Sequence, residues 1–186
     1  MISETKLAII ETMDLYKTFG NKKVLRGINL SIKKGESLAI IGTSGSGKSV
    51  LIKNIIGLLD PDAGAVRING TNVLSLNDKR RGEFNRKFGV LFQGAALFDS
   101  LPIWENIAFG LIQVDGLDRK TAYEKAQDSM LQVGLSPELA NFYPGELSGG
   151  MQKRVGLARA ITTKPEIIFF DEPTTGLDPI MASIID

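Results

Sequence analysis

SLAIIGTSGSGKS, residues 37–49, is the stretch that says most about the architecture of this chain. It opens with a continuous apolar run, residues 37–41, which fits a buried strand. A glycine-rich loop follows and matches the pattern G-x-x-x-x-G-K-[ST], with its fixed positions at Gly42, Gly47, Lys48 and Ser49. An apolar helical pattern over residues 49–59 comes next, so we expect the loop to join a strand to a helix.

A loop of this composition at the start of a helix is suited to bind phosphate. Glycines let the backbone curl until several N–H groups face one anion, and the helix N-terminus points at the same place. Lys48 would reach the β- and γ-phosphates of a nucleoside triphosphate, and the Ser49 hydroxyl would ligate Mg²⁺. The alternative is an ordinary glycine-rich turn before a helix, but the strand–loop–helix context favours phosphate binding.

The flanking segments predict a mixed α/β protein. Residues 7–13 and 28–32 fit strands, residues 33–36 fit a turn, and residues 65–73 fit a hairpin around Asn69-Gly70. Later segments predict a strand over residues 87–93, a helical region from Trp104 to Val133 closed by Gly134, a helix over residues 148–163 ended by Pro165, and a strand over residues 166–170. Strands that alternate with helices indicate a mainly parallel core, here with an antiparallel edge and a helical insertion.

The composition is that of one ordinary globular domain. The chain has 186 residues, of which 43% are hydrophobic and 23% charged, and its net charge is +1. This charge implies no global attraction to nucleic acid or anionic lipid. The absence of cysteine and histidine excludes disulfides and removes the commonest general base. No run approaches the roughly 18 apolar residues of a membrane span, and no signal peptide is visible, so we expect a cytosolic protein.

One basic cluster, KRRGEFNRK, covers residues 79–87. Such a run is usually a solvated helix face, which is the interpretation that we favour. A position near lipid headgroups or a partner is the alternative.

An acidic pair follows the apolar run at residues 167–170. Asp171 ends the expected strand, where a carboxylate can hold the Mg²⁺ of a bound nucleotide. Glu172 comes next, so its side chain takes a different direction and is available to polarise an attacking water. A plain acidic turn is the alternative, but the phosphate-binding loop in the same chain favours the catalytic interpretation.

LSGGMQ, residues 147–152, predicts a second anion-binding helix start. A Ser148 hydroxyl and the exposed amides of Gly149 and Gly150 would suit an anion. An ordinary helix cap would explain the serine alone, whereas the double glycine lowers helix stability and needs a reason. The chain therefore carries two expected phosphate-binding helix starts for one nucleotide.

Taken in order, these motifs resemble the nucleotide-binding domain of ATP-binding-cassette (ABC) transporters. GTSGSGKS is similar to the Walker A motif, LSGGMQKR to the signature motif, IIFFDE to the Walker B motif and TGLD to the D-loop. Gln93, in VLFQ, matches the Q-loop glutamine, and Tyr16, in DLYKTFG, matches the aromatic residue that stacks on adenine. Without the resemblance, Tyr16 would be interpreted as a core aromatic at a strand end and Gln93 as a solvated amide.

The resemblance implies a P-loop NTPase fold with an N-terminal antiparallel β-subdomain and a helical signature subdomain. It also implies roles for single residues. Lys48, Gln93 and Glu172 are expected to be catalytic, and Ser49, Gln93 and Asp171 to hold Mg²⁺. The residues expected to bind ATP are Tyr16, Gly42, Thr43, Ser44, Gly45, Ser46, Gly47, Lys48, Ser49, Val50, Ser148, Gly149, Gly150 and Asp178.

The resemblance further implies a head-to-tail homodimer in which the Walker A motif of one chain and the signature motif of the other enclose each ATP. This arrangement would explain the second helix start and would put Asp178 at the dimer seam. The implied partners are integral-membrane permease subunits, with the ATPase peripheral on the cytoplasmic face of the inner membrane. No nucleic-acid partner is expected.

GAALFDSLPIWENIAFGL, residues 94–111, lies in the region that faces the permease in such domains. The sequence of this segment, together with TTGLDPIM, resembles that of the ATPase of bacterial Mla-type phospholipid transport systems. Ala95 stands where that family usually has glycine. This resemblance implies phospholipid transport and a periplasmic lipid-binding subunit. The alternatives are an ABC importer or exporter of another substrate, a soluble ABC ATPase outside transport, and a regulatory subunit that senses nucleotide without hydrolysing it.

The family pattern also has a switch histidine on a strand beyond the Walker B motif, and this sequence has no histidine. A C-terminal truncation, a divergent natural form and a subunit without turnover are the open interpretations, of which we favour the first. The chain would then be a single ABC ATPase domain, residues 1–186, with a core at 1–93 and 164–186, a helical subdomain at 94–163, and the C-terminal part of the sheet missing. Because unpaired interior backbone is costly, we expect the 186-residue chain by itself to be poorly stable or inactive.

Overall fold

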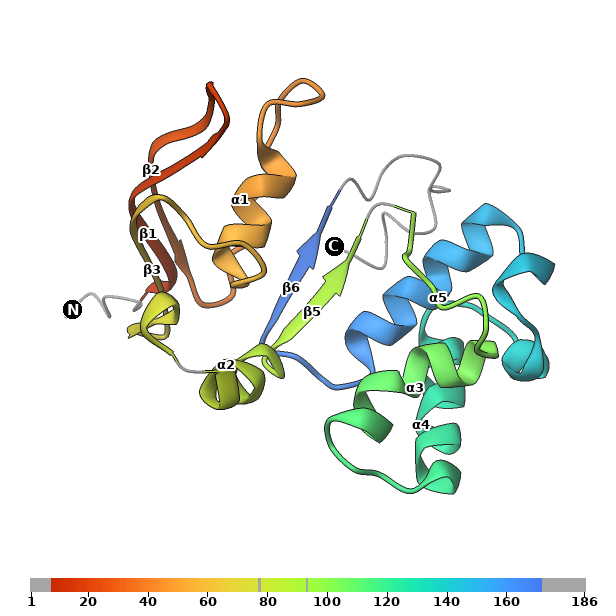
Figure 1. Cartoon of the computed structure of the whole chain (residues 1–186). Coiled ribbons are helices and arrows are strands. Elements are labelled where there is room, and N and C mark those ends of the chain that lie inside the picture. The colour runs from red at the N-terminus through yellow and green to blue at the C-terminus, as the bar shows by residue number, and fades with distance from the viewer. Residues whose placement is uncertain (1–7, 77, 93, 172–186) are drawn as a thin grey trace, which may run out of the picture. The chain divides into compact units, whose positions relative to one another are not determined.

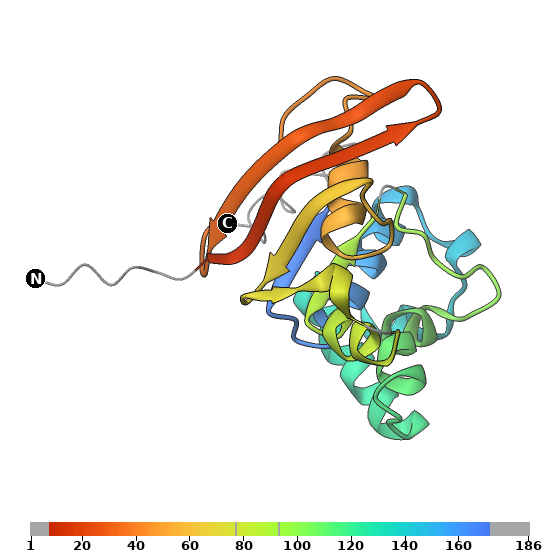
Figure 2. The ribbon, with the colours of Figure 1, turned by 60° about the vertical axis from the view of Figure 1, so that its left-hand side comes forward.

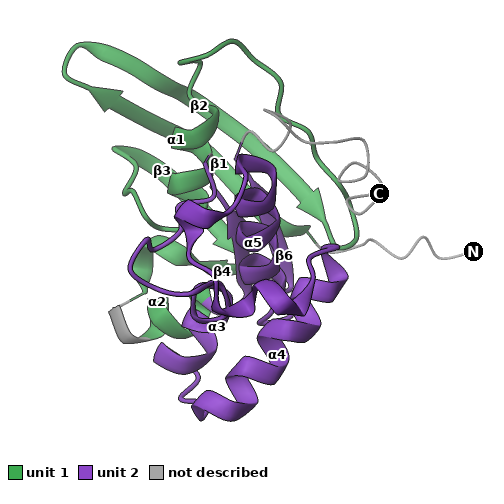
Figure 3. Cartoon of the chain, turned by 90° about the vertical axis from the view of Figure 1, so that its right-hand side faces the viewer, with its two compact units in different colours: residues 1–85 green, residues 86–186 purple. Residues whose placement is uncertain are grey.

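The computed structural model describes residues 8–76, 78–92 and 94–171. The chain forms two compact units, residues 1–85 and residues 86–186, which we call unit 1 and unit 2 (Figure 3). The division expected from the sequence, a core at 1–93 and 164–186 with a helical subdomain at 94–163, stays a prediction.

Unit 1 is built on a four-stranded sheet with the order β2-β1-β3-β4 (Figure 1). The strands are β1 (Ala8–Phe19), β2 (Lys22–Lys33), β3 (Ala63–Ile68) and β4 (Thr71–Asn72). Helix α1 (Lys48–Ile55) lies between β2 and β3 in the sequence, while the 3-10 helix η1 (Val73–Ser75) and helix α2 (Asp78–Asn85) follow β4. All three strand pairings are antiparallel, which confirms the prediction for this part of the chain.

The two longest strands of unit 1, β1 and β2, form one long hairpin (Figure 2). The hydrophobic side chains of unit 1 that are at most 4% exposed form its core, namely Ile10, Leu15, Leu25, Ile55, Ile56, Val66, Ile68 and Val73. The turn between β3 and β4 has φ of 48° at Asn69 and 76° at Gly70. Positive φ at both positions is what a tight Asn-Gly hairpin turn requires, so this predicted hairpin is confirmed.

The prediction of a strand over residues 37–41 is wrong, because residues 36–43 form neither helix nor strand. Leu38 and Ile40 are 45% and 40% exposed, and Ile41 is 93% exposed. A strand that is apolar at every position needs neighbouring strands and covered faces. Among the described residues the strands of unit 1 pair only with one another. The apolar pattern carries no information on whether such neighbours are in place.

Unit 2 combines a small parallel sheet with a helical cluster. Strand β5 (Phe88–Leu91) pairs in parallel with β6 (Ile167–Phe170). The helices are α3 (Ile103–Gln113), α4 (Arg119–Gln132) and α5 (Gly149–Ile161), with 3-10 helices η2 (Pro137–Asn141) and η3 (Pro144–Glu146). The parallel pairing confirms the α/β prediction, and the helical region expected from Trp104 to Val133 consists of two helices separated by residues 114–118.

Helices α3, α4 and α5 share one apolar core, to which Ile107, Met130 and Val155 each contribute a fully buried side chain. Asp118 caps the N-terminus of α4, and its carboxylate accepts hydrogen bonds from the Thr121 hydroxyl at 2.6 Å and the Thr121 N–H at 3.0 Å. These two bonds lower the pKa of Asp118. Gly134, with φ of 71°, lies just beyond the end of the helix, as the sequence predicts for a C-terminal glycine.

The basic cluster at residues 79–87 is partly neutralised by ion pairs within each unit. Arg81 lies 3.6 Å from Asp60, and Lys87 lies 3.2 Å from Glu166. These pairs support the interpretation of a solvated, internally paired surface. None of the helices that the structure describes has the length and apolar character needed to span a bilayer.

Candidate nucleotide-binding site

The glycine-rich loop at residues 42–49 has glycine at two of the positions that its motif fixes, Gly42 and Gly47. Gly47, which caps α1, has φ of 105°, a left-handed value that favours glycine. A Cβ atom at Gly47 would lie 2.8 Å from the Val24 side chain, and one at Gly42 would lie 2.7 Å from the Ser46 hydroxyl. Both the left-handed φ and the close approach to Val24 thus disfavour a side chain at Gly47, whereas at Gly42 the Ser46 hydroxyl could rotate away.

Lys48 lies over this loop. Its ammonium donates hydrogen bonds to the carbonyl oxygens of Gly42 at 2.8 Å and Thr43 at 3.1 Å. The first helical bond of α1, from the Leu51 N–H to the Gly47 carbonyl at 2.9 Å, starts next to it. A cation, a curled glycine backbone and a helix N-terminus therefore meet in one loop, and this combination fits a phosphate group.

The predicted Mg²⁺ ligands lie in both units. Ser49 is in the first turn of α1, in unit 1, and Asp171 directly follows β6, in unit 2. Asp171 is 8% exposed, and its N–H donates to the Leu91 carbonyl at 2.9 Å. Hydroxyl and carboxylate oxygens are the hard donors that Mg²⁺ prefers, so the donor types fit the ion.

Three predicted site residues, Gln93, Glu172 and Asp178, lie outside the described residues. Their roles stay predictions. The described site residues divide between the units, with Tyr16 and the loop at residues 42–50 in unit 1, and Ser148, Gly149, Gly150 and Asp171 in unit 2.

Tyr16 lies in β1 with its side chain 44% exposed. It pairs with Arg26 of β2 and with Ala63 of β3. An aromatic ring that is partly exposed on a strand is available to stack on a planar ligand.

An open hollow near the turn of the β1–β2 hairpin is lined by Phe19, Asn21, Lys22, Lys23 and Arg26. Its cations would attract an anionic ligand. All five residues fall within positions 19–26, but they match no motif, so the sequence alone did not single them out.

Helix α5 begins where the second anion-binding helix start is expected. The Ser148 hydroxyl accepts a hydrogen bond from the Met151 N–H at 3.3 Å and so caps the helix. Gly149 and Gly150 are exposed, and a Cβ atom at either would meet no described atom within 4 Å. Packing within the described chain therefore does not require glycine at these two positions.

Sequence reasoning missed Arg159, which anchors the segment after β5 to α5. Ala95 and Ala96 have φ of 62° and 46°, and their carbonyl oxygens accept hydrogen bonds from the Arg159 guanidinium at 2.5 and 2.9 Å. Burial lowers the pKa of Arg159, although arginine stays charged in proteins. The left-handed φ at Ala95 fits the glycine that the resembling family usually has there.

Comparison with known proteins identifies the family of this chain. The sequence profile of the ABC transporter family matches residues 25–175. The chain is 42% identical over 186 residues to Protein TRIGALACTOSYLDIACYLGLYCEROL 3, chloroplastic, of Arabidopsis thaliana, an alignment that covers 96% of this chain and 53% of that protein. It is 40% identical over 176 residues to the probable ribonucleotide transport ATP-binding protein mkl of Mycobacterium leprae, covering 95% of this chain and 50% of that protein. The chain thus spans about half the length of these relatives.

Two further comparisons cover more of the matched protein. The histidine/lysine/arginine/ornithine transport ATP-binding protein HisP of Salmonella typhimurium is 38% identical, and the alignment covers 96% of this chain and 72% of HisP. The dimeric structure of the ATP-binding cassette MJ0796 in a post-hydrolysis state, bound to ADP and Pi, superposes with a TM-score of 0.86 at 33% identity, covering 95% of this chain and 79% of that one. The fold class predicted from the sequence is confirmed by this match, and the chain belongs to the ABC transporter family as an ATP-binding domain.

Proposed function

We propose that this chain is the ATP-binding and ATP-hydrolysing part of an ABC transporter. The observation that carries the proposal is the position of the Lys48 ammonium over the Gly42 and Thr43 carbonyls at the start of α1. A triphosphate needs a cation held beside a helix N-terminus in this way. The ADP and Pi bound to the MJ0796 cassette support hydrolysis as the reaction.

The phosphate-binding loop stabilises the negative charge of the reacting nucleotide. Lys48 binds the β- and γ-phosphates, while the loop amides hold the phosphate oxygens. Ser49, Gln93 and Asp171 would hold Mg²⁺, which would supply further positive charge to the phosphates. Tyr16 stacks on the adenine ring.

Glu172 positions the water that attacks the γ-phosphate. A carboxylate is sufficient for this role, because the transition state of phosphoryl transfer is loose and requires little proton abstraction early in the reaction. The glutamate can accept the proton as the reaction completes.

The nucleotide is enclosed, in this proposal, by two copies of the chain. Ser148, Gly149 and Gly150 of one copy face the γ-phosphate bound by the other, and Asp178 lies at the seam. The two exposed glycines support this arrangement, because nothing in the described chain requires them. The dimeric MJ0796 cassette supports it as well. ATP binding would close the dimer, and hydrolysis would reopen it.

The dimer would act on integral-membrane permease subunits, as a peripheral protein on the cytoplasmic face of the inner membrane. A solved relative, cbiO1 of Clostridium perfringens, is part of the ABC transporter complex cbiONQ. It is 29% identical with a TM-score of 0.79, and the match covers 96% of this chain and 70% of that one. The single ABC ATPase domain, with its core at 1–93 and 164–186 and its helical subdomain at 94–163, is part of this proposal.

Phospholipid is the substrate that we propose, with a periplasmic lipid-binding subunit as a further partner. The resemblance of residues 94–111 to the ATPase of Mla-type systems supports this choice, and so does the similarity to a chloroplast protein named for a galactolipid. Other relatives are named for ribonucleotides and for amino acids, so an ABC transporter of another substrate is the second candidate. Phospholipid transfer between vesicles, driven by ATP in the presence of the co-purified permease, separates the two.

Two substitutions test the proposed chemistry. Lys48→Ala should abolish ATP binding, because the phosphates lose their principal cation. Glu172→Gln should retain ATP binding and lower turnover by roughly 100-fold or more, the usual contribution of a general base. Lys53→Ala, at an exposed lysine of the same helix, is the matched control and should leave both quantities unchanged.

The measurements are the ATP dissociation constant and the rate of phosphate release by the full-length protein. Unchanged hydrolysis in Glu172→Gln would refute the role of that residue. Tight ATP binding without any hydrolysis by the unsubstituted protein would favour a nucleotide-sensing regulatory subunit instead.

A further inference from the structure

Strand β1 is irregular around Tyr16. Its register shifts against β2 between Thr12 and Leu15 and again between Leu15 and Tyr16, and Asp14 has φ of 44°. Leu15 is fully buried, whereas Tyr16 is 44% exposed. A bulged strand has fewer regular ladder bonds, so restraints from outside the ladder decide where such a side chain points.

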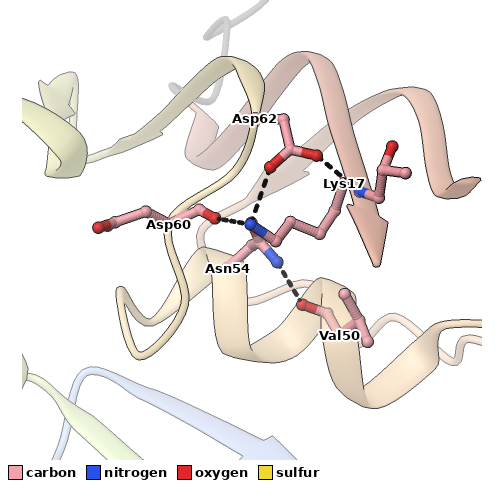
Figure 4. A network of polar contacts seen from close by, with 6 residues as sticks. Lys17, Val50, Asn54, Asp60 and Asp62 are labelled. Atoms are coloured by element: carbon pink, nitrogen blue, oxygen red, sulfur yellow. Dashed lines mark hydrogen bonds and ion pairs between the residues drawn. The ribbon is translucent and has the colours of Figure 1, made fainter. Parts of the chain in front are cut away.

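Asp62 supplies these restraints to the backbone. Its N–H donates to the Tyr16 carbonyl at 2.9 Å. Its carboxylate accepts from the Thr18 N–H at 2.6 Å and from the Lys17 ammonium at 2.9 Å (Figure 4). Lys17 donates in addition to the Asp60 carbonyl at 2.7 Å. One residue between α1 and β3 thus fixes three consecutive residues of β1.

Gly27 supplies a restraint to the ring. This glycine of β2 has φ of 73°, and a Cβ atom there would lie 2.7 Å from the Tyr16 hydroxyl oxygen and 3.0 Å from Cζ. The phenol end of Tyr16 therefore rests against glycine backbone. Any side chain at position 27 would force the ring to move.

We infer that Gly27 and Asp62 are positioning residues for the nucleobase: they fix the Tyr16 ring in the orientation in which it stacks, and so determine the base-dependent part of nucleotide affinity. A ring that is fixed before binding loses less conformational freedom when the ligand arrives. The inference deepens the proposed function and rests on it, because it needs Tyr16 to be the residue that stacks on adenine.

The test compares ATP with inorganic tripolyphosphate, which has the phosphates but no base. Asp62→Asn and Gly27→Ala should each weaken ATP binding by roughly 3- to 10-fold, the range that one aromatic contact supplies. Both should leave the tripolyphosphate dissociation constant within about 2-fold of the unsubstituted protein, because the phosphate-binding loop is unchanged. Calorimetric titration of the full chain gives both constants, and circular dichroism checks the fold of each variant.

Two matched controls separate positioning from general damage. Asp60→Asn removes the same charge two residues away and keeps the main-chain carbonyl that Lys17 contacts. Gly70→Ala introduces the same left-handed strain as Gly27→Ala, since Gly70 has φ of 76°, but its Cβ would meet nothing within 4 Å. Both controls should keep the ATP-to-tripolyphosphate affinity ratio of the unsubstituted protein.

Tyr16→Ala measures how much ATP affinity is lost when the stacking contact with the base is removed. In that background, adding Asp62→Asn or Gly27→Ala should cause no further loss of ATP affinity. The inference is overturned if Tyr16→Ala weakens ATP binding while both positioning variants bind ATP normally, and also if they lose ATP and tripolyphosphate equally. Failure of the proposed function looks different, because then the unsubstituted protein would not bind ATP, or Tyr16→Ala would bind it undiminished.

Discussion

The carboxylate of Asp62 makes the N-terminal sheet sensitive to acid. The hydrogen bond from the Lys17 side chain, and then the one from the Thr18 N–H, lower the pKa of Asp62 in the folded protein. In the unfolded chain an aspartate has a pKa of about 3.9. The unfolded state therefore binds more protons as the pH falls through this range, so the contribution of Asp62 to stability is complete above about pH 4 and disappears below its lowered pKa.

Asp62→Asn should consequently destabilise the protein at pH 7, and the difference from the unsubstituted protein should shrink as the pH falls below about 4. Denaturant unfolding of both proteins over a pH series measures this difference. Asp60→Asn is the control, because the Asp60 side chain is 73% exposed and lies 3.6 Å from its partner Arg81. A pH-independent difference for Asp62→Asn would show that the carboxylate charge is not what stabilises β1.

Single residues differed in how far the sequence could assign them. Gly42, Gly47 and Lys48 follow from a spacing whose physical reason is local, and the structure places all three where the loop leads into α1, while their roles stay predictions. The sequence predicts only an ordinary turn residue at Asp62, because its hydrogen-bond partners Lys17 and Thr18 are far away in the sequence. Gly27 did carry a signal, since an isolated glycine in a strand indicates a close approach of another group. The sequence does not show that this group is the Tyr16 ring.

Two fully buried asparagines show how one residue type serves two helices differently. Asn106, in the first half of α3, accepts from the Phe98 N–H at 2.7 Å and donates to the carbonyls of Phe98 at 3.0 Å and Leu101 at 2.9 Å. Asn54, in α1, donates to the Val50 carbonyl at 2.7 Å (Figure 4). The Oδ1 atom of Asn54 is buried without a hydrogen-bond partner among the described residues.

Replacement of each asparagine by leucine should therefore have unequal effects. Asn106→Leu leaves several buried backbone groups without their partner and should lower the free energy of unfolding by about 2–4 kcal/mol. Asn54→Leu removes an unsatisfied buried oxygen together with one hydrogen bond, so its effect should stay within about 1 kcal/mol. Urea unfolding at pH 7 measures both. Equal losses in the two variants would contradict the difference in hydrogen bonding described above.

Elements were predictable where their pattern was self-contained. Helix α5 has its cap at Ser148, and β3 and β4 have their turn at Asn69 and Gly70, so both were predicted close to their observed bounds. The strand expected at residues 37–41 failed because a fully apolar strand depends on neighbours that its own residues do not specify. The expected helical region contains two helices, and the break between α3 and α4 falls at Asp115-Gly116, a pair of residues that signals a turn.

The two expected phosphate-binding helix starts belong to different compact units of the molecule, α1 to unit 1 and α5 to unit 2. Their glycines differ in kind. Gly47 is favoured by its left-handed φ and by contacts within the chain, whereas a side chain at Gly149 or Gly150 would meet nothing described within 4 Å. Glycine in a helix is unfavourable by up to about 1 kcal/mol relative to alanine. This cost without an internal reason points to a ligand or a second chain that approaches α5 closely.

Gly150→Ala should thus stabilise the isolated chain and impair the assembled one. We expect the free energy of unfolding to rise by up to about 1 kcal/mol, because alanine is the better helix former. In a Glu172→Gln background, where hydrolysis is slow, ATP should convert the parent protein into dimers, while the Gly150→Ala variant should stay monomeric because its methyl group occupies the space that the partner's γ-phosphate needs. Light scattering after size-exclusion chromatography measures the mass.

The matched control is Gly82→Ala, which should dimerise normally. Gly82 is an exposed glycine of α2, and a Cβ atom there would also meet nothing within 4 Å. Dimers of Gly150→Ala as abundant as those of the control would exclude a close approach to α5 in the assembled protein.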